Sequence, residues 1–269
     1  MPEINSSDIG QFCWADLSTT DPEAAKTFYG SLFGWDIEDM PLPGGGVYSM
    51  ARKNGRYVGA VSAQMDEERA QGAPPHWNAY VNVDDVDTYA KRAEAGGGTI
   101  LMAPFDVLDS GRMAVLLDPT GAVFCMWQPQ EHSGFGLVGE PGAMVWNELI
   151  TSDTAKARTF YTELFGWKAE AMPAPGGSNV TEYIVLNLGD APVAGLMTTP
   201  EGMEMPPNWT VYYATADCKA SAAKVTELGG QIYFGPQFME TVGTFATCAD
   251  PQGAVFALLE PDPGAQAPQ

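Results

Sequence analysis

The sequence has few histidines, few basic residues and no cysteine pairs, and each shortage narrows the range of functions. Only two of the 269 residues are histidine, which leaves few imidazoles for a transition-metal site. Lys and Arg number 13 against 34 Asp and Glu, and the net charge is −21. Because nucleic acids are bound mainly through Lys and Arg, this balance argues against a nucleic-acid partner. The four cysteines form no CxxC motif and predict buried thiols rather than a disulfide framework.

Long apolar runs are also missing. A membrane span needs about 18 apolar residues in succession, and no such run occurs. The N-terminal MPEINSSDIGQF lacks the basic region and the apolar core of a signal peptide. We therefore expect a cytoplasmic protein without a membrane partner. Hydrophobic residues still make up 45% of the chain, which is enough for a folded core.

The two halves of the chain repeat each other. The octet FYGSLFGW at residues 28–35 returns as FYTELFGW at residues 160–167, 132 positions later, with six of eight letters unchanged. The same offset aligns FCWADL with MVWNEL, PPHWNAYV with PPNWTVYY, and DPTGAVF with DPQGAVF. A chain of this length suits two domains. We predict a duplicated domain with copies at residues 8–129 and 143–261, joined by a Gly-rich linker at residues 130–142.

Each copy predicts the same order of elements twice: a strand, a helix and three strands. In the first copy the strand QFCWADL precedes a helix that Asp21 caps, Pro22 opens and Gly34 ends. The buried stripe of this helix has the spacing of one helix face and comprises Ala25, Phe28, Tyr29, Leu32 and Phe33. A second such set runs from WNAYVNV to AVFCMWQ. The chain is therefore predicted to be an α+β protein of four βαβββ units.

These motifs resemble the vicinal oxygen chelate superfamily, also called the glyoxalase/bleomycin-resistance/dioxygenase fold. The resemblance covers nearly the whole chain and extends to actinobacterial two-domain proteins labelled glyoxalase-like or hydroxylase. It implies curled mixed sheets with helices outside and a concave face, or cup, that binds a small ligand. Function stays open, because members include metal-dependent isomerases, ring-cleaving dioxygenases and metal-free binding proteins. Whether units pair within a copy or across copies also stays open.

The metal ligands that this resemblance implies are missing. Metal-using members carry His, Gln or Glu on the concave strands, and a fourth ligand would fall in YVGAVSA or APVAGLM, where neither His, Glu nor Cys occurs. The other matching positions in the first and second copies are Trp14 and Trp146, Asn78 and Thr210, and Cys125 and Ala257. His132 lies in the predicted linker, and His76 has no counterpart in the second copy. A catalytic metal usually takes about three protein ligands. We therefore predict no metal and no other cofactor.

Strand alternation predicts which side chains line the cups. If the ligand positions face inward, residues two positions away face inward too. The first cup then presents Phe12, Trp14, Asp16, His76, Asn78, Tyr80, Val123, Cys125 and Trp127, and the second presents Trp146, Glu148, Thr210, Tyr212, Val255, Ala257 and Leu259. Aromatic rings with a few polar groups are typical of a pocket for a flat, partly polar molecule. The same rings could equally fill the interior of the sheet.

Asp16 and Glu148 are the candidate catalytic residues. A carboxyl group on an apolar face needs a partner or a shifted pKa, and Arg112 is one candidate partner for Asp16. Arg112 could instead hold an anionic ligand group at the rim of the first cup, or be a solvated strand end. The first cup is the better candidate if only one works, because the second copy lacks counterparts of Asn78, Arg112 and Cys125.

Three functions compete. The leading hypothesis is a metal-free protein that binds a small aromatic or amphipathic molecule, in sequestration, resistance or an accessory step of secondary metabolism. The predicted ligand contacts are Trp14, Asn78, Tyr80, Arg112, Cys125, Trp127, Trp146 and Tyr212. The first rival is a metal-independent enzyme with Asp16 or Glu148 as general base and Asn78 or Arg112 stabilising negative charge. The second is a structural protein with filled cups. The oligomeric state stays open between a monomer and a homodimer.

Overall fold

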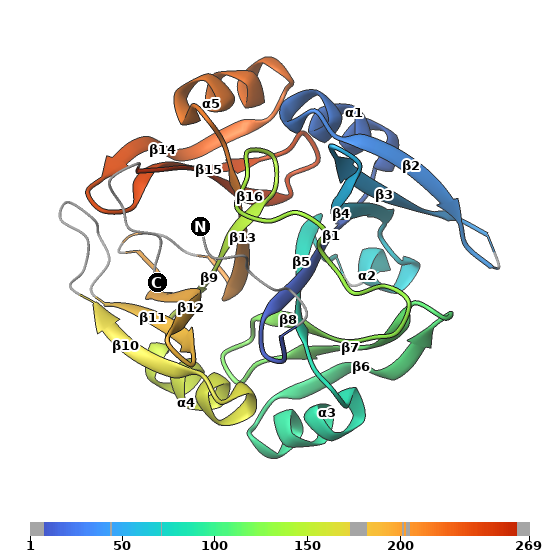
Figure 1. Cartoon of the computed structure of the whole chain (residues 1–269), viewed down its shortest axis with the longest axis vertical. Coiled ribbons are helices and arrows are strands. Elements are labelled where there is room, and N and C mark those ends of the chain that lie inside the picture. Colours follow the sequence, from blue (N-terminus) through green and yellow to red (C-terminus); the bar gives the residue numbers. More distant parts are fainter. Residues whose placement is uncertain are drawn as a thin grey trace.

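Two eight-stranded mixed sheets, one from each repeat, form the protein (Figure 1). The computed structural model describes residues 8–43, 45–70, 72–172, 182–200, 202 and 205–262. The first sheet has the strand order β2-β3-β4-β1-β5-β8-β7-β6. Its strands are β1 (Phe12–Thr19), β2 (Asp36–Pro41), β3 (Val47–Lys53), β4 (Arg56–Ala63), β5 (His76–Asn82), β6 (Thr99–Val107), β7 (Gly111–Leu117) and β8 (Val123–Pro129). Its helices are α1 (Pro22–Phe33), α2 (Asp66–Ala70) and α3 (Val86–Ala95).

The second sheet repeats this arrangement in the order β10-β11-β12-β9-β13-β16-β15-β14. Its strands are β9 (Met144–Thr151), β10 (Lys168–Met172), β11 (Tyr183–Leu188), β12 (Ala191–Thr198), β13 (Asn208–Ala214), β14 (Gln231–Met239), β15 (Gly243–Ala249) and β16 (Val255–Pro261). Its helices are α4 (Thr154–Phe165) and α5 (Cys218–Glu227). The predicted α+β fold of four βαβββ units is confirmed, while the boundaries of the two domains stay a prediction.

The units pair within each copy, which answers the question that the sequence left open. In the first copy β1 pairs antiparallel with β5, and in the second β9 pairs antiparallel with β13. Parallel pairs flank these strands, β1 with β4 and β5 with β8 in the first sheet. All eight strands of each sheet therefore come from one copy. No described helix is long and apolar enough to cross a membrane.

The helix signals read from the sequence are present in the structure. The Asp21 side chain accepts a hydrogen bond from Ala24 N, and α1 ends at Gly34 with φ of 66°. Asp153 and Gly166 play the same parts for α4. Because a left-handed residue at the helix end favours glycine, the Gly-Trp that closes each octet fixes where the helix stops.

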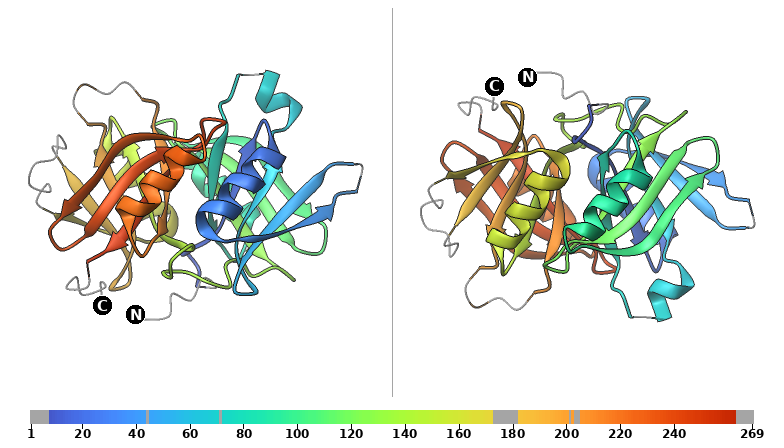
Figure 2. Two further views of the ribbon diagram at one scale, coloured as in Figure 1. Left: turned by 90° about the horizontal axis from the view of Figure 1, so that it is seen from above. Right: turned by 90° about the horizontal axis from the view of Figure 1, so that it is seen from below.

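The repeated octets also join the two copies. The hydroxyl of Tyr29 on α1 donates to Asp250 Oδ2 at 3.1 Å, in the DPQG turn of the second copy. Reciprocally, the hydroxyl of Tyr161 on α4 donates to Asp118 Oδ2 at 3.0 Å, in the DPTG turn of the first. Figure 2 shows the result, with α1 beside α5 on one side of the molecule and α3 beside α4 on the other. Each copy therefore donates the equivalent tyrosine hydrogen bond to the other, which makes the contact nearly symmetric.

The tryptophans that end the octets extend this contact. Trp35 Nε1 donates to Gly142 O at 2.7 Å, just before β9, and Trp167 Nε1 donates to Gly10 O at 2.9 Å, just before β1. Both indoles are buried, and one continuous apolar core spans both copies. The octets therefore help to hold the two copies together.

Candidate functional site

A hydrogen-bonded chain of aromatic side chains surrounds Asp16 at the centre of the first cup. Asp16 Oδ1 accepts from Asn78 Nδ2 at 3.0 Å, and Oδ2 accepts from the hydroxyls of Tyr48 at 2.9 Å and Tyr80 at 2.8 Å. The Tyr48 hydroxyl in turn accepts from Trp14 Nε1 at 2.9 Å. Asp16 is only 7% exposed. Both of its oxygens are thus satisfied by uncharged donors.

Burial dominates the electrostatics of this carboxyl group. It raises the pKa of Asp16 above its ordinary value, while the hydrogen bonds from Asn78, Tyr80 and Tyr48 oppose the shift. No cation lies among its hydrogen-bonding partners. The site therefore favours the neutral acid more than an exposed aspartate would.

The predicted ion pair between Asp16 and Arg112 is wrong. Arg112 lies on β7, which is separated from β1 by β5 and β8. Its guanidinium pairs with Asp87 at 2.7 Å and with Asp106 at 2.9 Å, and Asp106 is its direct partner on β6. The distance across two strands explains the miss, because side chains reach mainly their nearest strand neighbours. A ligand role for Arg112 stays a prediction, although its guanidinium group already forms ion pairs with Asp87 and Asp106.

Cys125 and Trp127 line the first cup on β8 as the alternation predicts. Cys125 pairs with Tyr80 across the parallel β5–β8 ladder and is buried, and burial raises the pKa of its thiol well above the ordinary value. His76 Nδ1 lies 2.8 Å from the Pro74 carbonyl oxygen and its Nε2 lies 3.9 Å from Glu68 Oε1, and neither contact involves the thiol. A neutral thiol without a base is a packing group rather than a nucleophile.

Phe12, expected in the first cup, lies outside it. The β1–β5 register shifts between Phe12 and Trp14, and this bulge turns Phe12 to the opposite face. Its ring packs against Trp167 at 5.9 Å and Trp209 at 5.1 Å in the second copy. Strict alternation fails here because one extra residue in a strand reverses every side chain beyond it.

The second cup repeats the core of the first around Glu148. The Tyr212 hydroxyl donates to Glu148 Oε1 at 2.6 Å, and Tyr183 also hydrogen-bonds this carboxyl group. Trp146 hydrogen-bonds Tyr183, as Trp14 does Tyr48. Burial raises the pKa of Glu148 above its ordinary value of 4.5. Thr210, at the place of Asn78, bonds Asn208 at 2.9 Å instead of the acid. Glu148 therefore has one donor fewer than Asp16 among the described residues.

The sequence reasoning missed Tyr48 and Tyr183, which connect the tryptophan to the acid in each cup. They lie on β3 and β11, strands that carry no ligand position in the resemblance. Their offset is 135 rather than 132, because more residues separate β10 from β11 than separate β2 from β3. The usable signal was a tyrosine near the start of the strand after each Gly/Pro-rich turn.

The connection between the sheets covers the first cup. Figure 1 shows this green segment passing across the strands of the first sheet. Phe135 N donates to Cys13 O at 2.7 Å, and Gly136 N donates to Tyr57 O at 2.9 Å. The His132 and Phe135 rings lie 4.5 Å and 5.4 Å from the Trp14 ring. Trp14 is consequently 4% exposed, whereas its counterpart Trp146 is half-buried.

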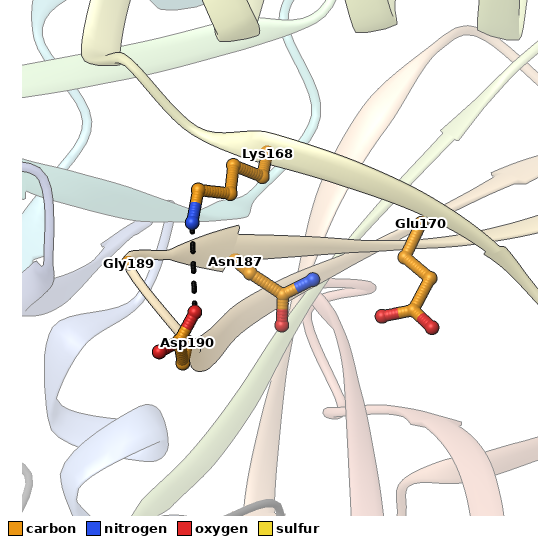
Figure 3. A pocket seen from close by; sticks show the side chains of 5 residues that line it. All are labelled: Lys168, Glu170, Asn187, Gly189 and Asp190. Atoms are coloured by element: carbon orange, nitrogen blue, oxygen red, sulfur yellow. Dashed lines mark hydrogen bonds and ion pairs between the residues drawn. The ribbon is translucent and has the colours of Figure 1, made fainter.

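A hollow of about 370 Å³ lies over β10, β11 and the turn after β11, at the edge of the second sheet (Figure 3). Its lining residues are Lys168, Glu170, Asn187, Gly189 and Asp190, with Lys168 Nζ 3.5 Å from Asp190 Oδ1. Direct pairing links Glu170 to Val185, Val185 to Gly195, and Gly195 to Glu148 across four neighbouring strands. Paired residues point to one side, so the hollow is a polar rim of the second cup, about 14 Å from Glu148 by strand spacing.

The family profile "Glyoxalase/Bleomycin resistance protein/Dioxygenase superfamily" matches residues 10–126 and 143–258. The chain belongs to this superfamily. It is 45% identical over 264 residues to the Mycobacterium tuberculosis protein named "Putative glyoxylase CFP32", covering 98% of this chain and 99% of the relative. It is 36% identical over 261 residues to "Anthracycline biosynthesis protein DnrV" of Streptomyces peucetius, covering 93% of each. The solved Mn(II)-bound glyoxalase of Novosphingobium aromaticivorans shares the fold, with a TM-score of 0.63 at 17% identity, covering 94% of this chain and 82% of that one.

The side chains present do not fit the metal that the superfamily implies. Among the described residues no three His, Cys, Asp or Glu side chains lie close enough together to hold an ion. Trp14 and Trp146 present an indole N–H, which is a donor and cannot ligate a cation. Asp16 is surrounded by donors, whereas a metal site needs several acceptors around one point. The donor set thus suits a carboxyl group and not a cation.

Proposed function

We propose that this protein binds a small, flat, partly polar molecule in its second cup without a metal. The observation that carries the proposal is Glu148, a buried carboxyl group with a raised pKa beside the half-buried Trp146. A ring can stack on the indole while the acid bonds a polar atom of the ligand. The first cup offers no such access, because His132 and Phe135 cover Trp14.

The rest of the second face supports a flat ligand. Phe234 and Phe245 stack on each other with centroids 5.5 Å apart, and Phe234 is 39% exposed. Phe245 pairs with Leu259 on β16. Leu259 lies two residues after Ala257, which pairs with Tyr212, so these residues share one face of the sheet. Apolar rings therefore continue from the acid toward β14, while the opposite rim is polar. This gradient suits a molecule with one aromatic end and one hydrogen-bonding end.

A protonated Glu148 would donate a hydrogen bond to a carbonyl or phenol oxygen of the ligand. Tyr212 and Tyr183 donate to the same group and leave its own proton free to point into the cup. The relative from Streptomyces peucetius is named for anthracycline biosynthesis. We therefore choose quinizarin, a dihydroxyanthraquinone with both features, as the test ligand.

Fluorescence titration of the full chain with quinizarin tests the proposal. Wild-type protein should bind, and Glu148→Ala should weaken binding at least about tenfold, the equivalent of roughly 1.4 kcal/mol. Glu148→Gln should bind at neutral pH with an affinity that does not vary with pH, whereas wild-type affinity should fall as the acid ionises. Phe238→Ala is the control, because Phe238 is 62% exposed and pairs outside the row of Phe245. Equal binding by wild type and Glu148→Ala would refute the assignment.

Catalysis without a metal is the second candidate, favoured by the same raised pKa. A carboxyl group whose pKa is raised by burial can act as a general base that removes a proton from the ligand. In this role Glu148→Gln would retain ligand affinity but lose turnover, which separates an enzyme from a binding protein. Asp16 is less suited as a base, because three donors already occupy its oxygens.

A further inference from the structure

The first cup contains the same hydrogen-bonded core as the second, yet its tryptophan is closed off. Residues 131–137, here called the cover segment, lie over it. Trp14 is 4% exposed beneath this segment, and Phe135 and Leu137 within it are 7% and 4% exposed. An acid, two tyrosines and a tryptophan recur in both cups, but Asp16 has the additional donor Asn78, and Trp14 is less exposed than Trp146.

The cover segment has a fixed part that follows Gly134. Phe135 N donates to Cys13 O at 2.7 Å, and Leu137 N donates to Tyr57 O at 3.2 Å. The bulge at Cys13 frees its carbonyl from the β1–β5 ladder for this bond. Gly134 has φ of 104°, and a Cβ there would collide with the Cys13 carbonyl. The segment can therefore lie against β1 only with glycine at this position.

The imidazole of His132 forms the inner part of the cover segment. It stands edge-on to Trp14 at 4.5 Å, Tyr57 at 5.6 Å and Trp127 at 6.0 Å. These three rings come from β1, β4 and β8 and enclose the imidazole. Its Nε2 is buried without a hydrogen-bond partner among the described residues. Burial also lowers the pKa of His132, which keeps the ring neutral in this position.

We propose that the first cup is a second site for the same class of flat ligand, closed by the cover segment with His132 in the place of the ligand ring. This inference rests on the proposed function. The imidazole is a flat ring held edge-on among Trp14, Tyr57 and Trp127, and edge-on packing is one of the arrangements that aromatic rings prefer. The buried Nε2 of His132 has no hydrogen-bond partner among the described residues, which costs free energy. A ligand whose polar atoms all form hydrogen bonds would avoid this cost and could displace the imidazole.

Binding stoichiometry of quinizarin, measured by equilibrium dialysis on the full chain, tests this. Wild-type protein should bind one molecule per chain at saturation. His132→Ala and, independently, Gly134→Ala should each bind two, since both remove the imidazole from the Trp14 ring. Adding Trp14→Ala to His132→Ala should return the number to one. Glu131→Ala, an exposed neighbour in the same segment, is the matched control and should stay at one.

A readout without ligand guards against variants that merely misfold. In Gly134→Ala the amides of Phe135 and Leu137 should exchange with solvent faster, while amides of β9 to β16 keep their protection. A stoichiometry of one for His132→Ala with intact circular dichroism would overturn the inference and leave the proposed function standing. No binding by wild type, with one molecule on His132→Ala that Trp14→Ala abolishes, would support it and refute the second-cup proposal. Two molecules on wild type, or none on any variant, would overturn it.

Discussion

Replacing Tyr29 by Phe should destabilise the protein through a contact on the opposite face of β5 from the first cup. The Tyr29 hydroxyl donates to Asp250 Oδ2 at 3.1 Å and accepts from Trp77 Nε1 at 3.0 Å, and the residue is 0% exposed. The substitution leaves a buried acceptor and a buried donor without a partner. Each such group costs about 1–3 kcal/mol. We expect a loss of about 2–4 kcal/mol, because Asp250 keeps its backbone bonds through Oδ1.

Urea unfolding followed by tryptophan fluorescence and circular dichroism measures this loss. The repeat provides an internal duplicate, since Tyr161→Phe removes the same bond to Asp118 in the other direction and should cost a similar amount. Tyr57→Phe is the control, because its hydroxyl only accepts from Arg52 at a half-exposed site and should cost under about 0.5 kcal/mol. A Tyr29→Phe midpoint that matches the control would refute the view that the octets join the copies through this bond.

Two further predictions concern the second cup. Because burial raises the folded-state pKa of Glu148 above 4.5, its contribution to stability is complete below that pH and is lost as the pH rises through the folded-state value. As the pH rises above 4.5, the urea midpoint of wild type should therefore fall more than that of Glu148→Gln, and parallel curves would contradict this. Gly195→Ala should cost about 1–3 kcal/mol in a thermal or urea melt, since its Cβ would collide with the Tyr183 hydroxyl and lie 3.0 Å from Trp146 Nε1. An unchanged melt would show that the core of the second cup is looser than described.

Local signals in the sequence were sufficient for the helices. The N-caps at Asp21 and Asp153 and the glycines at 34 and 166 act within one or two turns of the chain, so their effect can be read without the rest of the protein. The superfamily resemblance then supplied the sheet, which depends on contacts between distant strands. Inward positions of Trp14, Asp16 and Tyr80 followed from alternation along regular stretches.

Features of the site that depend on the length of a turn or on one extra residue could not be read in this way. Tyr183 bonds Glu148 although its offset from Tyr48 is 135 positions rather than 132, so counting by the repeat offset does not find it. Phe12 leaves the cup because of a bulge that no composition rule indicates. His132 was placed in a linker, and a flexible connection and a segment packed on Trp14 have the same polar, Gly-rich composition.

The hydrogen bonds in both cups run in the opposite direction to those expected at a metal site. A metal site gathers acceptors around a positive centre, whereas here donors gather around a carboxyl group. Asp16 accepts from Asn78, Tyr48 and Tyr80, which fills most of its capacity. Glu148 lacks the amide donor, because Thr210 turns to Asn208. Because the second copy has no counterpart of Asn78, Glu148 can form one more hydrogen bond than Asp16 can. That difference points to the second cup as the one with a hydrogen bond to offer.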